Sequence, residues 1–414
     1  MFRPYPGDPR PRRVGADRRV PPRGSRLAGE RRRAIPQADR RPTLEGIGTV
    51  ADWVPLNDLS RSIDEHRDEL SDAFRDVLRS GWLVLGPQVS ALEEELAAYL
   101  GCAHVVGVAS GTDALMLSIQ AAMPPGRSAV VTAANAGGYA TTAIHRAGYA
   151  ARLADVEEAD HCLSVRTVEP VLTPEVGVVV VTHLYGQAAR VEPIRDLCRH
   201  REVALIEDCA QALGAHTATG MAGTIGDLGT LSFYPTKNLG ALGDGGAVAA
   251  NSAELADRVR RLRQYGWTTK YRVGVDGGCN SRLDEVQASI LRSRLPRLET
   301  WNRRRRDILS RYVHAARPPV RVLGGAATEH VAHLAVAVCP QRGRLADHLA
   351  AHRIRTDVHY PVPDHHQPAW ADRFTGVSLP VTERLAQQVL TLPLFPQMHE
   401  DEVERVCQAL AEFC

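Results

Sequence analysis

The sequence predicts an α/β protein with a mostly parallel central sheet covered by helices, followed by a smaller C-terminal α+β domain. Short apolar segments alternate with helical patterns from residue 104 to residue 236, as in repeated βα units. The segment "VGVVVV" (176–181) has no polar alternation, which is typical of a parallel strand buried on both faces. From Leu283 the pattern becomes helical, and shorter strands return after residue 315, so a second domain is expected.

The elements can be assigned in order along the chain. Two helices are expected over 59–81 and 90–101, each ended by a glycine. In the first of them, Ile63, Leu70, Phe74 and Leu78 would share one face. The expected strands are 104–110, 128–134, 151–157, 176–186, 203–215, 229–236 and 333–339. The expected later helices are 111–122, 141–148, 191–202, 283–313 and 344–354.

Three segments are expected from length and composition. The chain has 414 residues and is 44% hydrophobic, enough for two cores, which we place at 54–305 and 306–414. Residues 1–53 form an Arg- and Pro-rich stretch, with thirteen arginines and four acids in 1–42. It lacks apolar periodicity and is predicted to be a disordered tail or upstream sequence from an early start codon, the alternative being a nucleic-acid or targeting arm.

Composition excludes several classes of function. Without residues 1–42 acids outnumber bases, which argues against a nucleic-acid partner, and no apolar run is long enough for a membrane helix. The eight cysteines show no CxxC spacing, which favours free thiols in a cytoplasmic protein. "DHHQ" (364–367) has two adjacent histidines, which alone do not make a metal site, so no metal is expected.

One lysine is conspicuous. The chain has 48 arginines and only two lysines, Lys237 and Lys270. A guanidinium stays protonated, whereas a desolvated amine can lose its proton and form a Schiff base. Lys237 follows a predicted strand and precedes "NLGALGDGG", whose glycines allow close approach to a ligand. We therefore expect amine chemistry at Lys237, although an exposed loop lysine is the simpler alternative.

Two further features lie at predicted strand ends, where α/β proteins bind ligands. The strand "VALIED" delivers Asp208, which fits the carboxylate that keeps the ring nitrogen of pyridoxal phosphate protonated. The alternative for this residue taken alone is a loop acid or a helix N-cap. "ASGTDAL" (109–115) opens a helix at Gly111 and Thr112, which suits a phosphate. The order GxxxxGK[ST] is absent, and no GxGxxG follows the first strand, so P-loop and Rossmann sites are rejected.

The chain resembles the DegT-type sugar aminotransferases, which are fold-type I pyridoxal phosphate enzymes acting on nucleotide-linked keto-sugars. The motifs that carry the resemblance, in order, are "SGTDAL", "HLYGQ", "IEDCAQALGA", "SFYPTKNLGALGDGGAV", "RQYG" and "GCNSRLDEVQASIL". The resemblance runs from about Val54 to the C-terminus. It leaves the first fifty residues unmatched.

The resemblance implies a role for particular residues. Lys237 would hold the internal aldimine and move the proton, Asp208 would pair with the ring nitrogen, and Gln211 would lie near the ring oxygen. Gly111, Thr112 and Ser232 would bind the phosphate. Asn280 would reach the phosphate of the neighbouring subunit, which requires a homodimer with shared active sites. The family's ring-stacking aromatic lies in a "TF-x-AT" type segment, whereas this chain reads "NAGGYATTAI", so Tyr139 is the expected aromatic in an uncertain register.

The resemblance further implies an aminotransferase that takes the amino group from glutamate. A family relative that removes a hydroxyl has His in place of the lysine, so Lys237 favours transamination. The motifs look more like those of enzymes acting at C3 of dTDP-3-keto-6-deoxyhexoses, in deoxyamino-sugar and antibiotic biosynthesis. Tyr185, Lys270, His359 and Tyr360 are expected substrate contacts. Two alternatives stay open: a keto-cyclitol aminotransferase, and a catalytically silent sugar-nucleotide-binding or regulatory protein.

Overall fold

The computed structural model describes residues 52–324 and 328–414. The tail expected over residues 1–53 lies outside the described residues except for its last two positions. Val54 already belongs to the fold: it is fully buried, and its backbone N–H donates to the carbonyl of Arg353 at 2.9 Å. The expected boundary between the tail and the folded part near Val54 stays a prediction.

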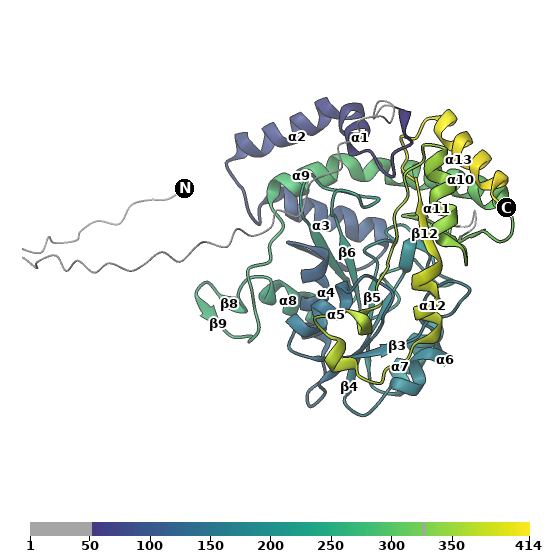
Figure 1. Ribbon diagram of the computed structural model, residues 1–414. Helices are drawn as coiled ribbons and strands as arrows, with labels where there is room; N and C mark the ends of the chain where they lie inside the picture. Colours follow the sequence, from purple (N-terminus) through teal and green to yellow (C-terminus); the bar gives the residue numbers. More distant parts are fainter. Residues whose placement is uncertain (1–51, 325–327) are drawn as a thin grey trace, which may run out of the picture. The chain divides into compact units, whose positions relative to one another are not determined.

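A seven-stranded sheet forms the centre of the described chain (Figure 1). Its order is β1-β7-β6-β5-β4-β2-β3. The strands between β3 and β6 pair in parallel, whereas β7 runs antiparallel to both β1 and β6. The mostly parallel α/β fold predicted from the sequence is confirmed, and the antiparallel β7 was missed. The strands are β1 (His104–Val108), β2 (Ala129–Ala133), β3 (Ala150–Ala154), β4 (Val176–Thr182), β5 (Ala204–Asp208), β6 (Leu228–Ser232) and β7 (Gly246–Ala250).

Helices cover both faces of this sheet, as the uninterrupted valines of β4 require. Val178 and Val180 pack in one apolar cluster with helices α4 (Gly111–Ala122), α5 (Tyr139–Arg146) and α8 (Ala253–Leu262). Val179 and Val181 face the opposite way and pack with α7 (Val191–His200). Alternate residues of one strand thus enter two separate cores, because successive side chains of a strand point to opposite faces. The short helix α6 (Val165–Val168) lies between β3 and β4.

The N-terminal helix expected over 59–81 is two helices, α1 (Leu59–Glu65) and α2 (Arg67–Ser80). The chain leaves helical geometry at His66, with φ −125° and ψ 21°. Leu70 packs with Ile290, but Phe74 is 45% exposed and Leu78 is 58% exposed. The expected apolar face exists, and part of it is uncovered in a single chain.

The C-terminal part contains a second, antiparallel sheet, β10 (Arg321–Val322), β11 (Ala335–Val338) and β12 (Val389–Leu392). It shares an apolar cluster with α10 (Leu298–Ala315), α11 (Arg342–Ala351) and α13 (Glu400–Glu412). The helix expected over 283–313 is divided into α9 (Glu285–Arg294) and α10 by a 3₁₀ turn containing Pro296. The remaining elements are α3 (Pro87–Leu100), α12 (Pro380–Gln388) and the hairpin β8 (Trp267–Thr269) and β9 (Arg272–Val273).

The expected division at residue 305 falls inside α10, and the two-domain boundary stays a prediction. All eight cysteines are free thiols. Among the described residues, no helix has the length and apolar character needed to cross a bilayer.

Candidate active site

A cavity of about 650 Å³ lies beyond the carboxyl ends of the parallel strands. Ser110, Thr182, Asp208 and Ser232, at or just after the ends of four strands, line one side of it. The C-terminal part of the chain closes the other side with His333, Leu334, Val358, His359, Tyr360, Thr391, Leu392 and Leu394. The cavity therefore forms where a parallel sheet exposes its strand ends, as predicted from the sequence.

Lys237 lies in the loop after β6 and lines this cavity. The loop is held by a hydrogen bond in which the backbone N–H of Lys237 donates to the carbonyl of Tyr234 at 2.8 Å. Burial lowers the pKa of Lys237 from 10.5 to about 8, while the negative charge of Asp208 acts in the opposite direction. At pH 7 a minor fraction of the amine is therefore neutral, and the neutral amine is the form that acts as a nucleophile.

Asp208 is the last residue of β5 and is 5% exposed. Its Oδ1 accepts a hydrogen bond from the backbone N–H of Ala210 at 3.0 Å, and its Oδ2 accepts from the hydroxyl of Thr182 at 3.3 Å. Burial raises the pKa of Asp208, and the Ala210 hydrogen bond and the charge of Lys237 oppose that effect. A buried carboxylate at the cavity wall is stabilised by a cationic or protonated partner.

Glu207, the neighbouring acid, points to the other side of the strand, and its carboxylate makes only structural hydrogen bonds among the described residues. It accepts hydrogen bonds from the backbone N–H groups of Gly223, Ile225 and Gly226, at 3.0, 2.7 and 2.8 Å. It also accepts from Nε2 of His183 at 2.9 Å, because Nδ1 of that ring already accepts from the N–H of Ala189. Of the two acids that end this strand, only Asp208 is available to the cavity.

The start of α4 forms a narrow cradle. Ser110 caps the helix by accepting a hydrogen bond from the N–H of Asp113 at 3.1 Å, and Gly111 and Thr112 line the cavity. A Cβ on Gly111 would lie 2.6 Å from Cβ of Ser232. The helix N-terminus and the end of β6 are therefore in direct contact, and this approach requires glycine. Free N–H groups at such a position bind an anion.

Gln211 organises the wall formed by the C-terminal segment. Its Oε1 accepts from the N–H of Tyr185 at 2.7 Å, so its Nε2 donates to the hydroxyl of Tyr360 at 3.0 Å. Tyr185 is 3% exposed, and its hydroxyl donates to the carbonyl of His359 at 2.6 Å. Tyr185 does not line the cavity, whereas His359 and Tyr360 do. Tyr185 thus supports His359 through this hydrogen bond, and its expected contact with the substrate stays a prediction.

Tyr139 stands at the start of α5 and lines the cavity, with 52% of its surface exposed. Its ring meets that of Tyr360 edge-on, with the centroids 6.0 Å apart. Gly137 and Gly138 precede it with φ values of 75° and 77°, and a Cβ on Gly137 would lie 2.8 Å from the Tyr360 ring. The absence of a side chain at Gly137 therefore leaves room for the ring of Tyr360.

Two of the expected residues lie away from the cavity of their own chain. Asn280 is exposed and does not line it. Lys270 connects β8 and β9, and its Nζ lies 5.1 Å from the centre of the Tyr271 ring. The hairpin projects beside α8 in Figure 1. The expected ligand contacts of Asn280 and Lys270 stay predictions.

His333 is a cavity residue that was not predicted from the sequence, and its tautomer can be deduced. Asn302 donates from Nδ2 to the carbonyl of Leu213, which leaves its Oδ1 as an acceptor. Asn238 donates from Nδ2 to that Oδ1 and to the carbonyl of Val331, at 2.8 and 3.0 Å, so its own Oδ1 accepts. The partner of that Oδ1 is Nδ1 of His333 at 3.0 Å, which must carry the proton.

Nε2 of His333 therefore holds a lone pair. Burial lowers the pKa of His333 well below its usual value, and the nearby charges of Lys237 and Arg305 act in the same direction. The imidazole is neutral near pH 7 and lines the same cavity as Lys237. No local sequence signal identifies it, because His333 precedes an apolar strand nearly a hundred residues after the lysine.

Comparisons with known proteins agree on one family. A family model described as the DegT/DnrJ/EryC1/StrS aminotransferase family matches residues 64–411. The chain is 40% identical over 362 residues to a dTDP-3-amino-3,4,6-trideoxy-alpha-D-glucose transaminase of Micromonospora megalomicea subsp. nigra, which covers 84% of this chain and 96% of the relative.

Two solved structures are also similar. DesV of S. venezuelae, in complex with a ketimine intermediate, superimposes with a TM-score of 0.83 and 37% identity, over 87% of this chain and 98% of that chain. NtdA of Bacillus subtilis, with bound cofactor PMP, gives a TM-score of 0.81 and 28% identity, over 87% of this chain and 84% of that chain.

Proposed function

The chain belongs to the DegT/DnrJ/EryC1/StrS aminotransferase family and is an aminotransferase, and on this premise we propose that it transfers the amino group of glutamate to a nucleotide-linked keto-sugar. The cofactor of the proposed reaction is pyridoxal 5'-phosphate. The observation that carries the proposal is one cavity that brings together Lys237, the buried carboxylate of Asp208 and the cradle between Gly111 and Ser232.

The residues present fit this cofactor. The cradle, which a single Cβ would fill, suits a phosphate, and Gly111, Thr112 and Ser232 would hold it there. The buried carboxylate of Asp208 suits a protonated ring nitrogen. Tyr139 would pack against the ring and Gln211 would lie near its oxygen. Bound there, pyridoxal phosphate supplies an electron sink for the carbanion left by removal of a proton.

The chain's own groups account for the remaining steps. Nζ of Lys237 accepts and returns a proton, and its pKa of about 8 matches that task near neutral pH. The lone pair on Nε2 of His333 would accept a hydrogen bond from an ammonium group in the cavity, which favours one orientation of the amine. The C-terminal segment with His359 and Tyr360 would contact the sugar and exclude water from it.

A nucleotide-linked sugar fits the dimensions and lining of the cavity. About 650 Å³ is within the range of ligand cavities and exceeds what a cofactor of this size requires. The transaminase that is 40% identical is named for a dTDP-linked 3-amino sugar. We infer a dTDP-3-keto-6-deoxyhexose as the acceptor, in the biosynthesis of a deoxyamino sugar.

We further infer a homodimer with shared active sites. Asn280 and Lys270 do not line the cavity of their own chain, and we propose that they serve that of the second subunit. Apolar side chains in the second half of α2 and just after it are exposed: Phe74 (45%), Leu78 (58%), Trp82 (57%) and Leu83 (56%). Such a patch favours a protein partner. The eight free cysteines favour the reducing cytoplasm as the location.

A spectrum and an assay test the proposal. Purified protein with pyridoxal phosphate should show an absorbance band that is lost in Lys237→Ala and kept in Lys270→Ala. Glutamate and a panel of keto substrates should then yield 2-oxoglutarate with the nucleotide keto-sugar. A band that survives in Lys237→Ala would refute the enzyme mechanism and favour a silent binding or regulatory protein. Turnover of keto-cyclitols alone would refute the sugar assignment.

A further inference from the structure

A second, smaller cavity of about 40 Å³ lies beside the lysine loop. It shares Asn57, Thr236 and Lys237 with the larger cavity. Its walls come from distant parts of the chain: the start of α1, the lysine loop, α9, α10 and the segment after β12. It is large enough for a small ion or a few water molecules and too small for a sugar.

Two buried guanidinium groups line this small cavity. Arg294 of α9 is 6% exposed and Arg305 of α10 is 5% exposed. Nη1 of Arg294 donates to the carbonyl of Gly240 at 2.6 Å. Nη1 of Arg305 donates to three backbone carbonyls, the shortest distance being 3.0 Å, to Leu394. Nε of each arginine is buried and lacks a hydrogen-bond partner among the described residues.

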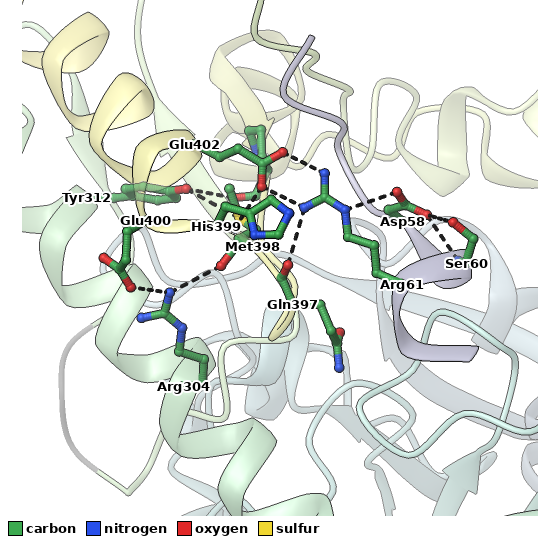
Figure 2. A network of polar contacts seen from close by, with 11 residues as sticks. Asp58, Ser60, Arg61, Arg304, Tyr312, Gln397, Met398, His399, Glu400 and Glu402 are labelled. Atoms are coloured by element: carbon green, nitrogen blue, oxygen red, sulfur yellow. Dashed lines mark hydrogen bonds and ion pairs between the residues drawn. The ribbon is translucent and has the colours of Figure 1, made fainter. Parts of the chain in front are cut away.

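No carboxylate in the described parts of the chain forms an ion pair with either arginine. Asp58 lines the cavity, but it is committed elsewhere: it accepts from the N–H of Ser60 at 3.0 Å and pairs with Nε of Arg61 at 3.2 Å. Figure 2 shows this arrangement, in which Arg61 lies between Asp58 and Glu402. The acids near the rim are thus already neutralised.

The imbalance of charge is costly. Backbone carbonyls satisfy part of each guanidinium, but they supply dipoles and no counter-charge. Burial lowers the pKa of Arg305 to about 10 and also lowers that of Arg294, and both groups remain protonated near pH 7. Two buried positive charges around one small cavity create a strong preference for a negative ion.

We propose that the small cavity binds a small inorganic anion of about the size of chloride between Arg294 and Arg305. The anion would accept the unpartnered Nε–H groups and supply the missing counter-charge. It would link α9, α10, the start of α1 and the lysine loop, so binding would stabilise the wall of the active site. A larger tetrahedral anion such as phosphate would be accommodated less well.

Thermal unfolding of the full-length protein with bound cofactor tests the proposal. Chloride would replace gluconate at constant ionic strength, so that general screening is unchanged. A saturable rise in Tm is expected, because a ligand that binds only the folded state stabilises it by mass action. In Arg294→Met and in Arg305→Met, the apparent affinity for chloride obtained from this rise in Tm should be at least tenfold lower. Arg303→Met is the matched control, because Arg303 lies on α10 like Arg305 but is exposed. This variant should respond to chloride like the wild type.

A measurement on the unmodified protein covers the case in which these variants do not fold. Crystals of the wild type grown with bromide should show an anomalous difference peak between the two guanidinium groups. If no such peak appears and the protein is equally stable in chloride and in gluconate, the cavity holds only water and the proposal is overturned. A chloride response of wild-type strength in both cavity variants, or binding of phosphate in preference to chloride, would also overturn it.

Discussion

The pKa of Lys237 can be measured directly, because the chain contains only one other lysine. With the cofactor removed, Lys237 should lose its proton with a midpoint near pH 8 instead of 10.5. Burial causes this shift, since a buried environment disfavours the charged ammonium more than it disfavours the neutral amine. The negative charge of Asp208 limits the shift. The perturbations to apply are therefore a change in pH and the substitution Asp208→Asn.

The size of the effect follows from the shift. A pKa of about 8 leaves about 10% of the amine neutral at pH 7, roughly 300-fold more than a pKa of 10.5 would leave. The same shift corresponds to about 3 kcal/mol of differential stabilisation. Between pH 8 and 10.5 the unfolded chain binds more protons at this lysine, so the site's contribution makes the folded state more stable as pH rises. In Asp208→Asn the midpoint should fall below pH 8.

Competitive labelling with a trace amount of an amine reagent, read out by peptide mass spectrometry, provides the assay. Lys270 in the exposed hairpin serves as the internal reference in the same sample. The ratio of the two labelled peptides, followed from pH 6 to 11, should show a midpoint near 8 for Lys237 that moves down in Asp208→Asn. A midpoint near 10.5, or one that rises in Asp208→Asn, would refute the account of the site.

Four further outcomes are expected. Gly111→Ala should weaken binding of pyridoxal phosphate at least tenfold, measured by titration of absorbance, while Gly343→Ala, whose added Cβ meets nothing within 4 Å, should not. Glu207→Gln should lower the free energy of unfolding by about 2–4 kcal/mol in urea, since the amide replaces an acceptor of backbone N–H groups with a donor. His333→Phe should lower kcat at least tenfold without moving the acid limb of its pH profile, because the imidazole is already neutral there. Deleting residues 1–50 should leave activity and Tm unchanged; a loss of either would contradict the prediction that the tail is dispensable.

Much of the site could be predicted from the sequence because its signals are local. The rarity of lysine drew attention to Lys237, and Asp208 and Gly111 stand at the ends of strands that their neighbouring residues identify. Parallel strands bring their carboxyl ends to one edge of a sheet, so these distant positions could be expected to meet. The structure places all three around one cavity.

Other features depended on contacts that leave no local pattern. The acids Glu207 and Asp208 cannot be told apart by their place in the sequence. Glu207 differs because its carboxylate accepts hydrogen bonds from backbone N–H groups of the loop at 223–226. The amide chain that fixes the tautomer of His333 joins residues of four separate segments.

The α/β architecture could be predicted from the sequence, and Lys237 and the strand-end residues could be proposed from it as site residues, since periodicity and residue type along short stretches carry these signals. The antiparallel β7, the neutral imidazole of His333 and the hydrogen bond from Tyr185 to His359 become visible only in the folded chain. The same holds for the guanidinium groups of Arg294 and Arg305, which lack a carboxylate partner among the described residues. The physical reason is that hydrogen-bond direction, burial and charge pairing are set by atoms brought together from remote parts of the chain.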